Sequence, residues 1–204
     1  MAINETLDQL RRALLRPEGP TSDYDLNPAL APRAALAGDP PPPLRPAAVL
    51  IGLQPRKGEL RLLLTKRASH LKHHPGQIAF PGGKQDAGDA DLIATALREA
   101  REEIGLPGAE ILGTLAAHET VTGFLATPVL ALLDPDFVPV RQEEEVEEVF
   151  SVPFDHIAEP GRFHIESRIW RGVRRHYFVA PYGPYYIWGA TARMLKALAD
   201  RMAA

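Results

Sequence analysis

Cysteine is missing from all 204 residues of the sequence. Without a thiol, the chain can have no disulfide, no cysteine nucleophile and no cysteine-ligated zinc site. Long apolar runs are missing too, because no stretch approaches the ~18 residues that a membrane-spanning helix needs. The first ten residues, MAINETLDQL, are polar and acidic and do not resemble a secretory signal. We therefore expect a cytoplasmic protein without a membrane partner.

A large charge of one sign is also missing. The formal net charge of −3 at pH 7 gives no reason to expect a nucleic-acid partner. Hydrophobic residues make up 45% of the chain and charged residues 24%, which is ordinary for a soluble globular protein. A chain of this length can bury one sizeable core.

The N-terminal part is expected to differ from the rest of the chain. Residues 4–15 predict a short helix with Asn4 as its cap. Its apolar stripe consists of Leu7, Leu10 and Leu14. Residues 16–46 are rich in Pro, Ala, Gly and Asp, which favours an extended arm. We therefore divide the chain into a helix and Pro-rich arm, residues 1–46, and a main domain, residues 47–204.

Short apolar runs predict the strands of the main domain. They cover residues 47–53, 60–66, 111–118 and 126–133, and a hairpin is expected from residues 163–170 and 174–180. Residues 187–202 predict a closing helix, with Trp188, Ala192, Leu195 and Ala199 on one side. Strands mixed with two substantial helices indicate an α/β or α+β fold.

The most informative stretch is FPGGKQDAGDADLIATALREAREEIGL, residues 80–106. A strand-like approach ends at a Pro-Gly-Gly break, and the helix that follows ends at Gly105. Glu99 and Glu103 share a face of this helix because residues four apart are neighbours, and Glu102 lies beside them. The stripe expected to face the core consists of Ile93, Leu97, Ala100 and Ile104. Crowded carboxylates repel one another, so we expect a cation such as Mg²⁺ or Mn²⁺ there, together with a phosphate group.

Residues 98–106, REAREEIGL, resemble the REUxEExGU core of the Nudix box, the signature of the Nudix hydrolases. The usual box is G-x5-E-x7-REUxEExGU, whereas here Asp89 takes the first acidic position and one extra residue precedes Arg98. The resemblance implies an α/β/α sandwich around a mixed β-sheet. It also implies a metal-dependent hydrolase of a diphosphate.

The same resemblance implies roles for the residues of the box. Glu99 and Glu103 are the expected metal ligands, and Glu102 is a further ligand or the base that activates water. Arg98 would orient the carboxylates through ion pairs. Close approach of the backbone to metal or phosphate is expected at Gly82 and Gly83. The alternative is a solvated helix face with ordinary pairs such as Arg98–Glu102.

A basic, histidine-rich stretch, LLTKRASHLKHHPGQIAFPGG, occupies residues 63–83. It resembles LLTxR(S/A)x3Rx3Gx3FPGG, the element of the coenzyme A pyrophosphatase branch of the Nudix family, which also shares Asp89 and the longer box. Lys72 stands where that pattern has Arg, so the charge is kept and the bidentate fork is lost. Arg67 and Lys72 are our candidates for binding the phosphates of coenzyme A. A histidine metal site is an alternative, although the histidine spacing matches no strong zinc signature.

Two later segments add candidates. Five glutamates within residues 143–148 usually indicate a solvated or disordered loop. Nudix enzymes often take a distal metal ligand from such a loop, and we choose Glu145, with Glu144 and Glu147 as alternatives. Phe124, in a segment that also resembles the branch, is expected to line the substrate pocket.

The resemblance covers residues 44–200 and predicts a Mg²⁺- or Mn²⁺-dependent pyrophosphohydrolase. Water would attack the diphosphate of coenzyme A, in free, acyl or oxidised form, and give 3′,5′-ADP and 4′-phosphopantetheine. One alternative is a Nudix hydrolase of another nucleoside-diphosphate derivative, of the NADH or ADP-ribose type. The other is a non-catalytic Nudix-fold binding module, which the intact glutamates of the box disfavour. The expected partner is a small-molecule substrate, and the sequence leaves a homodimer open.

Overall fold

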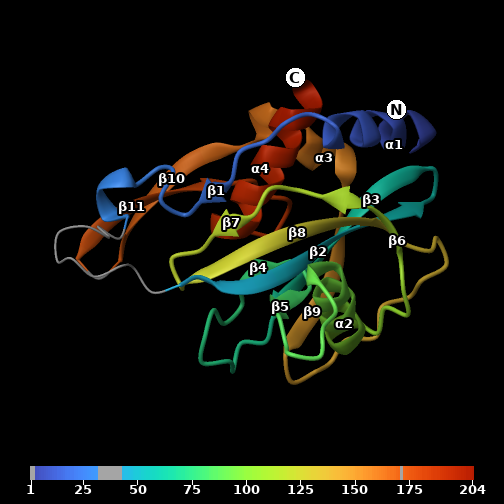
Figure 1. The fold of residues 1–204 in the computed structure, drawn as a ribbon, viewed down its shortest axis with the longest axis horizontal. Coiled ribbons are helices and arrows are strands. Elements are labelled where there is room, and N and C mark those ends of the chain that lie inside the picture. The colour runs from blue at the N-terminus through green and yellow to red at the C-terminus, as the bar shows by residue number, and fades with distance from the viewer. Residues whose placement is uncertain (1–2, 32–42, 171) are drawn as a thin grey trace.

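The computed structural model describes residues 3–31, 43–170 and 172–204. Residues 32–42 of the predicted Pro-rich arm therefore lie outside the described residues. Within them, a nine-stranded sheet crosses the middle of the molecule (Figure 1). Its strands are β1 (Thr21–Ser22), β2 (Arg45–Arg56), β3 (Glu59–Arg67), β4 (Ile78–Ala79), β5 (Gly82–Lys84), β6 (Glu110–Thr114), β7 (His118–Glu119), β8 (Phe124–Leu132) and β9 (Val146–Pro153).

The sheet is mixed, as predicted. The main order is β1-β7-β8-β2-β3-β4, and β5, β6 and β9 pair with β2, β8 and β3, respectively. β2 runs parallel to β8, and β1 runs parallel to β7, whereas β3 is antiparallel to both β2 and β9. β2 is central and covered on both faces, which explains why its sequence is a continuous apolar run.

Helices cover both faces of the sheet. They are α1 (Ile3–Leu14), α2 (Leu92–Ile104), α3 (Phe154–Ala158) and α4 (Gly189–Ala203), with short 3₁₀ turns at Pro28–Leu30 and Pro160–Arg162. Figure 1 shows α2 on one side and α1, α3 and α4 on the other. Two core clusters follow this division: Ala48 packs with the α2 side, and Ile51 packs with the opposite side. The predicted α/β/α sandwich is confirmed.

Several predicted elements have different bounds in the structure. Asn4 lies inside α1 and does not cap it, because the helix already includes Ile3. The strand expected over 111–118 is divided into β6 and β7. Trp188 precedes α4 in an extended conformation and is not part of the helix. The hairpin is confirmed as β10 (His164–Trp170) and β11 (Val173–Val179), which form a separate antiparallel sheet.

Two segments that we expected to lack regular structure are strands. Gly82–Lys84, at the predicted break, is β5 and pairs with Ala47–Val49 of β2. Val146–Glu148, in the predicted acidic loop, begins β9 and pairs with the end of β3. In both cases the pairing partner is distant in sequence, so local propensity does not reveal the strand.

The N-terminal segment packs closely on the main domain. Leu7 and Leu10 of α1 are buried in the same cluster as Ile51. β1 adds to the sheet beside β7, where the fully buried His118 contacts the hydroxyl of Thr21 at 2.8 Å. The division at residue 46 stays a prediction. Among the described helices, none is both long and apolar enough to cross a membrane.

Candidate active site

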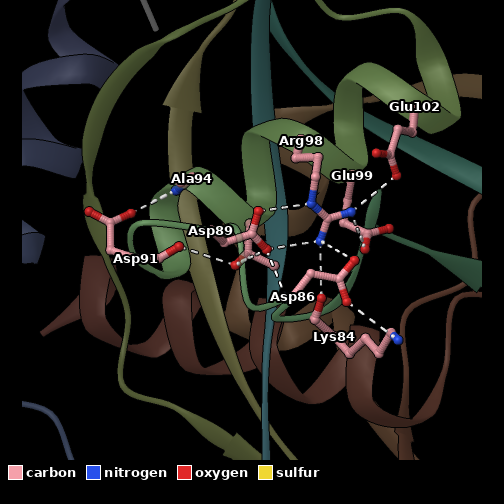
Figure 2. A network of polar contacts seen from close by, with 9 residues as sticks. Lys84, Asp86, Asp89, Asp91, Ala94, Arg98, Glu99 and Glu102 are labelled. Atoms are coloured by element: carbon pink, nitrogen blue, oxygen red, sulfur yellow. Dashed lines mark hydrogen bonds and ion pairs between the residues drawn. The ribbon is translucent and has the colours of Figure 1, made fainter.

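The glutamate-bearing helix α2 has well-defined ends. Asp91 caps its start, accepting a hydrogen bond from the backbone N–H of Ala94 at 2.7 Å (Figure 2). Gly105 ends it with φ 69°, in the left-handed region that favours glycine, and its N–H bonds to the carbonyls of Ala100 and Arg101. The predicted stop at Gly105 is confirmed. Ala100 and Ile104 are fully buried against the sheet, so the glutamates lie at the edge of this buried stripe.

Arg98 is the centre of the polar network on this helix (Figure 2). Its guanidinium donates to both carboxylate oxygens of Asp89, at 2.9 and 3.0 Å. It also donates to Glu99 at 3.0 Å, to Glu102 at 3.1 Å and to the carbonyl of Lys84 at 3.1 Å. One cation thus orients two box carboxylates and ties the helix to the end of β5.

Asp89 fixes the loop between β5 and α2. Its side chain is 7% exposed and also accepts hydrogen bonds from the Thr95 hydroxyl and the Asp86 backbone N–H. The hydrogen bonds from Arg98 hold the pKa of Asp89 well below its usual range. The shorter carboxylate at the first acidic position of the box therefore still reaches the arginine.

Two glycines make room where β5 passes between β2 and α2. A Cβ on Gly83 would lie 2.5 Å from Oε1 of Glu99. A Cβ on Gly82 would collide with the carbonyl of Ala48 and lie 2.7 Å from Cα of Val49. The backbone N–H of Gly82 also bonds to the carboxylate of Glu103. Gly83 thus approaches Glu99 and Gly82 approaches β2, whereas the predicted approach of both glycines to metal or phosphate stays a prediction.

Glu103 is a buried acid among other acids. Only 5% of the surface of this residue is exposed. Burial raises the pKa of Glu103 to about 8, with a further contribution from the charge of Glu99 and a smaller one from Glu145, whereas Arg67 opposes the shift. Burial likewise raises the pKa of Glu99, despite its bond to Arg98, and Glu145 adds to that effect. Burial and the neighbouring carboxylates therefore disfavour the ionised forms of both glutamates more than the arginines favour them.

The glutamates of the acidic segment have different partners. Glu147 forms an ion pair with Lys66 at 2.6 Å, and Glu148 accepts from the Tyr185 hydroxyl at 2.6 Å. The carbonyl of Glu145 accepts from the N–H of Ala68, which holds the backbone beside the end of β3. Glu145 itself acts electrostatically on both Glu99 and Glu103.

The structure brings some of the remaining candidates together and separates others. Arg67 ends β3 near Glu103, and its Nε is buried without a hydrogen-bond partner among the described residues. Lys72 is exposed on the loop that follows. Phe124 is partly buried and packs against the core cluster on the sheet face opposite α2, and the guanidinium carbon of Arg45 lies 3.9 Å from the centroid of its ring. Its predicted place in the substrate pocket is thus away from the glutamates.

Sequence reasoning missed the residues that hold β9 in place. Lys66 lies in a predicted strand next to Arg67, and only the pairing of β3 with β9 shows that it meets Glu147. Tyr185 stacks on Phe150 with ring centroids 3.6 Å apart and lies far along the chain from Glu148. No local signal in the sequence indicates either contact.

The chemistry of the carboxylates fits a divalent cation. Over the described ranges, no three His, Asp or Glu side chains already converge as a metal-binding group, and Glu99 is bonded to Arg98. The oxygens of Glu99, Glu103 and Glu145 are nevertheless hard ligands of the kind that Mg²⁺ and Mn²⁺ prefer. Burial disfavours the ionised forms of Glu99 and Glu103, as their raised pKa values indicate, and a bound cation would favour those forms.

Comparison with known proteins identifies the family. The model of the NUDIX domain matches residues 43–170. The chain belongs to the Nudix family. The Nudix hydrolase NudL of Enterobacter sp. (strain 638) is 46% identical over 157 residues, covering 76% of this chain and 81% of that protein. NudL of Salmonella newport (strain SL254) is 43% identical over 157 residues, which again cover 76% of this chain and 81% of that protein.

A solved structure shows the Nudix fold as well. The MutT/nudix family protein from Enterococcus faecalis matches with a TM-score of 0.52 at 17% identity, covering 80% of this chain and 63% of that one. The predicted family is confirmed. As a Nudix hydrolase, the protein acts on a phosphoanhydride bond in a nucleoside-diphosphate derivative, and Nudix hydrolases generally use divalent metal ions such as Mg²⁺ or Mn²⁺.

Proposed function

We propose that this Nudix hydrolase cleaves the diphosphate of coenzyme A, or of its acyl or oxidised forms, to 3′,5′-ADP and 4′-phosphopantetheine. The supporting observation is the placement of the segment 63–83. Its first part ends at Arg67, which acts on the charge of Glu103, and its last part supplies Gly82, which donates to the same carboxylate. A basic loop with the exposed Lys72 connects the two parts.

The acidic residues would have different roles in hydrolysis. Glu99, Glu103 and Glu145 would hold Mg²⁺ or Mn²⁺, with Glu102 as a further ligand or as the base that takes the proton of the attacking water. Such a cation, when bound, neutralises charge on phosphate oxygens and lowers the pKa of water. Arg98 keeps Glu99 and Glu102 oriented.

The basic residues would select the substrate. Coenzyme A carries a 3′-phosphate in addition to its diphosphate, so its site needs positive charge beyond the cation. Arg67 offers a buried Nε that has no hydrogen-bond partner in the described part of the chain, and Lys72 offers an exposed ammonium. Gly82 and Gly83 keep the floor of the site free of side chains. We keep Phe124 as a predicted pocket residue for a part of the substrate remote from the diphosphate.

A substrate panel with Mg²⁺ or Mn²⁺ tests the proposal. Coenzyme A should be cleaved with a higher kcat/KM than dephospho-coenzyme A, NADH and ADP-ribose, and acyl forms would show whether the thiol end matters. Indifference to the 3′-phosphate would overturn the assignment to coenzyme A. A higher kcat/KM for NADH or ADP-ribose would favour the alternative Nudix substrates. Absence of turnover with every compound would favour a binding module.

Charge reversal at the basic residues gives a second test. Lys72→Glu should raise the KM for coenzyme A roughly tenfold or more with little change in kcat. The new carboxylate would repel the phosphates of the substrate, and Lys72 is proposed to bind the substrate without taking part in the chemical step. Lys57→Glu, at the exposed turn between β2 and β3, is the matched control. An unchanged KM in both Lys72→Glu and Arg67→Glu would remove these residues from the site.

A further inference from the structure

The hairpin of β10 and β11 leaves one strand edge open. The two strands form their own sheet, in the layer of α4 and away from α2 (Figure 1). The outer edge of β11 is covered: the Asn27 side chain bonds to both the N–H and the carbonyl of His176 at 2.8 Å, and Val179 bridges to Trp188. Among the described parts of the chain, residues 164–169 of β10 have no backbone hydrogen bonds beyond those to β11.

One face of this open strand carries two exposed isoleucines. Ile165 is 52% exposed and Ile169 is 68% exposed, and both point to the same face because strand residues alternate. Trp170, at the end of the strand, is partly exposed on the other face. An isolated two-stranded sheet is marginally stable in water, and the unpaired backbone groups of an edge strand are a template for pairing with another chain.

The sequence of β10 is complementary to itself when it is read in the opposite direction. In an antiparallel pair centred on Ser167, Ile165 lies opposite the partner's Ile169 on one face. On the other face, Glu166 lies opposite the partner's Arg168. The neighbouring registers lack this match, because a centre at Glu166 pairs two glutamates and a centre at Arg168 pairs two arginines.

We propose that a second copy of this chain docks on β10, with the two-fold axis at Ser167. The two hairpins then form one four-stranded antiparallel sheet with the order β11-β10-β10-β11. Each copy supplies the same surface, as a two-fold interface requires. Self-complementary charge and apolar pairs at the same register are the reason for choosing a second copy over a different protein.

The interface is independent of the hydrolase site. The glutamates lie at α2, on the other side of the central sheet from α4 and the hairpin. Dimerisation should therefore occur without metal or substrate, and it stands or falls separately from the assignment to coenzyme A.

Sedimentation equilibrium on charge-reversed variants tests this arrangement. Glu166→Arg places two arginines opposite each other at both symmetry-related positions, and Arg168→Glu places two glutamates there. Each change should raise the dimer dissociation constant roughly tenfold or more, since attraction becomes repulsion at two sites. An equimolar mixture of the two variants should form a heterodimer with parental affinity, because every position again faces its opposite charge.

The mixture also controls for misfolding, because an unfolded variant would not regain a partner. Tyr186→Phe is the matched control: it removes the hydroxyl bonded to Glu166 and leaves the charges of the edge unchanged, so it should dimerise like the parent chain. A monomeric parent chain would overturn the proposal. Dimers that persist unchanged in both charge-reversed variants, or a mixture that stays monomeric, would overturn it as well.

Discussion

At the scale of single residues, Glu103 carries the clearest electrostatic signature in the molecule. Its carboxyl is buried beside Glu99 and near Glu145, whereas the N–H of Gly82 and the charge of Arg67 favour its ionised form. A group in this position either keeps a proton or meets a cation. Both its place in the proposed site and its effect on stability can be tested with one isosteric change.

Glu103→Gln should lower turnover by about 10²-fold or more, because it removes a carboxylate from the proposed cation site. It should also change how the stability of the metal-free protein depends on pH. The pKa of Glu103 is raised from 4.5 to about 8, so between these values the folded state holds a proton that the unfolded state releases. Stability is therefore lost as the pH rises across this window, by up to about 1.4 kcal/mol per unit.

Urea unfolding in the presence of a chelator, at several pH values between 5 and 8, measures this dependence. The parent chain should show the decline, and the Glu103→Gln variant should lack that part of it, because an amide does not titrate. An identical slope in the two proteins would contradict the burial of an uncompensated acid. Near-normal turnover in the variant would refute its place in the site.

Gly83→Ala should separate activity from stability. The new methyl group would meet the carboxylate of Glu99, which is the end of a flexible side chain and can move away at little cost to folding. The displaced carboxylate would no longer sit where its bond to Arg98 now holds it. We expect a loss of kcat of about tenfold or more with a change in unfolding free energy under about 1 kcal/mol. Unchanged kinetics would show that Glu99 does not act from its present position.

At the scale of elements, the end of α2 depends on one backbone conformation. Gly105 has φ 69° and a position with ordinary space around it, so Gly105→Ala should cost about 1 kcal/mol through the left-handed backbone alone. Gly88→Ala, in the open loop before the helix, is the control and should change stability by less than about 0.5 kcal/mol. Thermal unfolding measures both variants. Equal unfolding midpoints in the two would contradict a special role of the backbone conformation at Gly105.

The elements that could be predicted are those whose signals are local. Gly105 after an apolar stripe indicated where α2 ends, and the run at 47–53 indicated a buried strand. β5 could not be predicted, since Gly82 and Gly83 have little strand propensity and are held by β2 on one side and α2 on the other. The helix end and the central strand follow from local sequence, whereas β5 follows from its neighbours.

The same limit applies to the candidate site. The box spacing was enough to group Glu99, Glu102 and Glu103 on one helix. It left the choice among Glu144, Glu145 and Glu147 open, because the register depends on contacts of Glu147 with Lys66 and of Glu148 with Tyr185. Those partners are distant in sequence, so no spacing rule within residues 143–148 points to them.

At the scale of the whole molecule, the N-terminal helix is part of the core. Leu10 has no exposed surface and packs in the cluster that includes Ile51, so Leu10→Ala should destabilise the protein by about 2–5 kcal/mol. Leu15→Ala, at a side chain that is 86% exposed just past the helix, should have an effect within about 0.5 kcal/mol. Urea unfolding measures both. A small effect at Leu10 would support a helix that is separate from the main domain.

The pairing of early strands with late ones also determines when the protein becomes active. β2 pairs in parallel with β8, and β3 pairs with β9, so the sheet is completed only when distant parts of the chain come into contact. During synthesis, α2 leaves the ribosome before β9, and Glu99 and Glu103 then lack the segment that brings Glu145. On the proposed site, hydrolysis is therefore among the last properties gained during folding, and its return during refolding reports that β9 has docked.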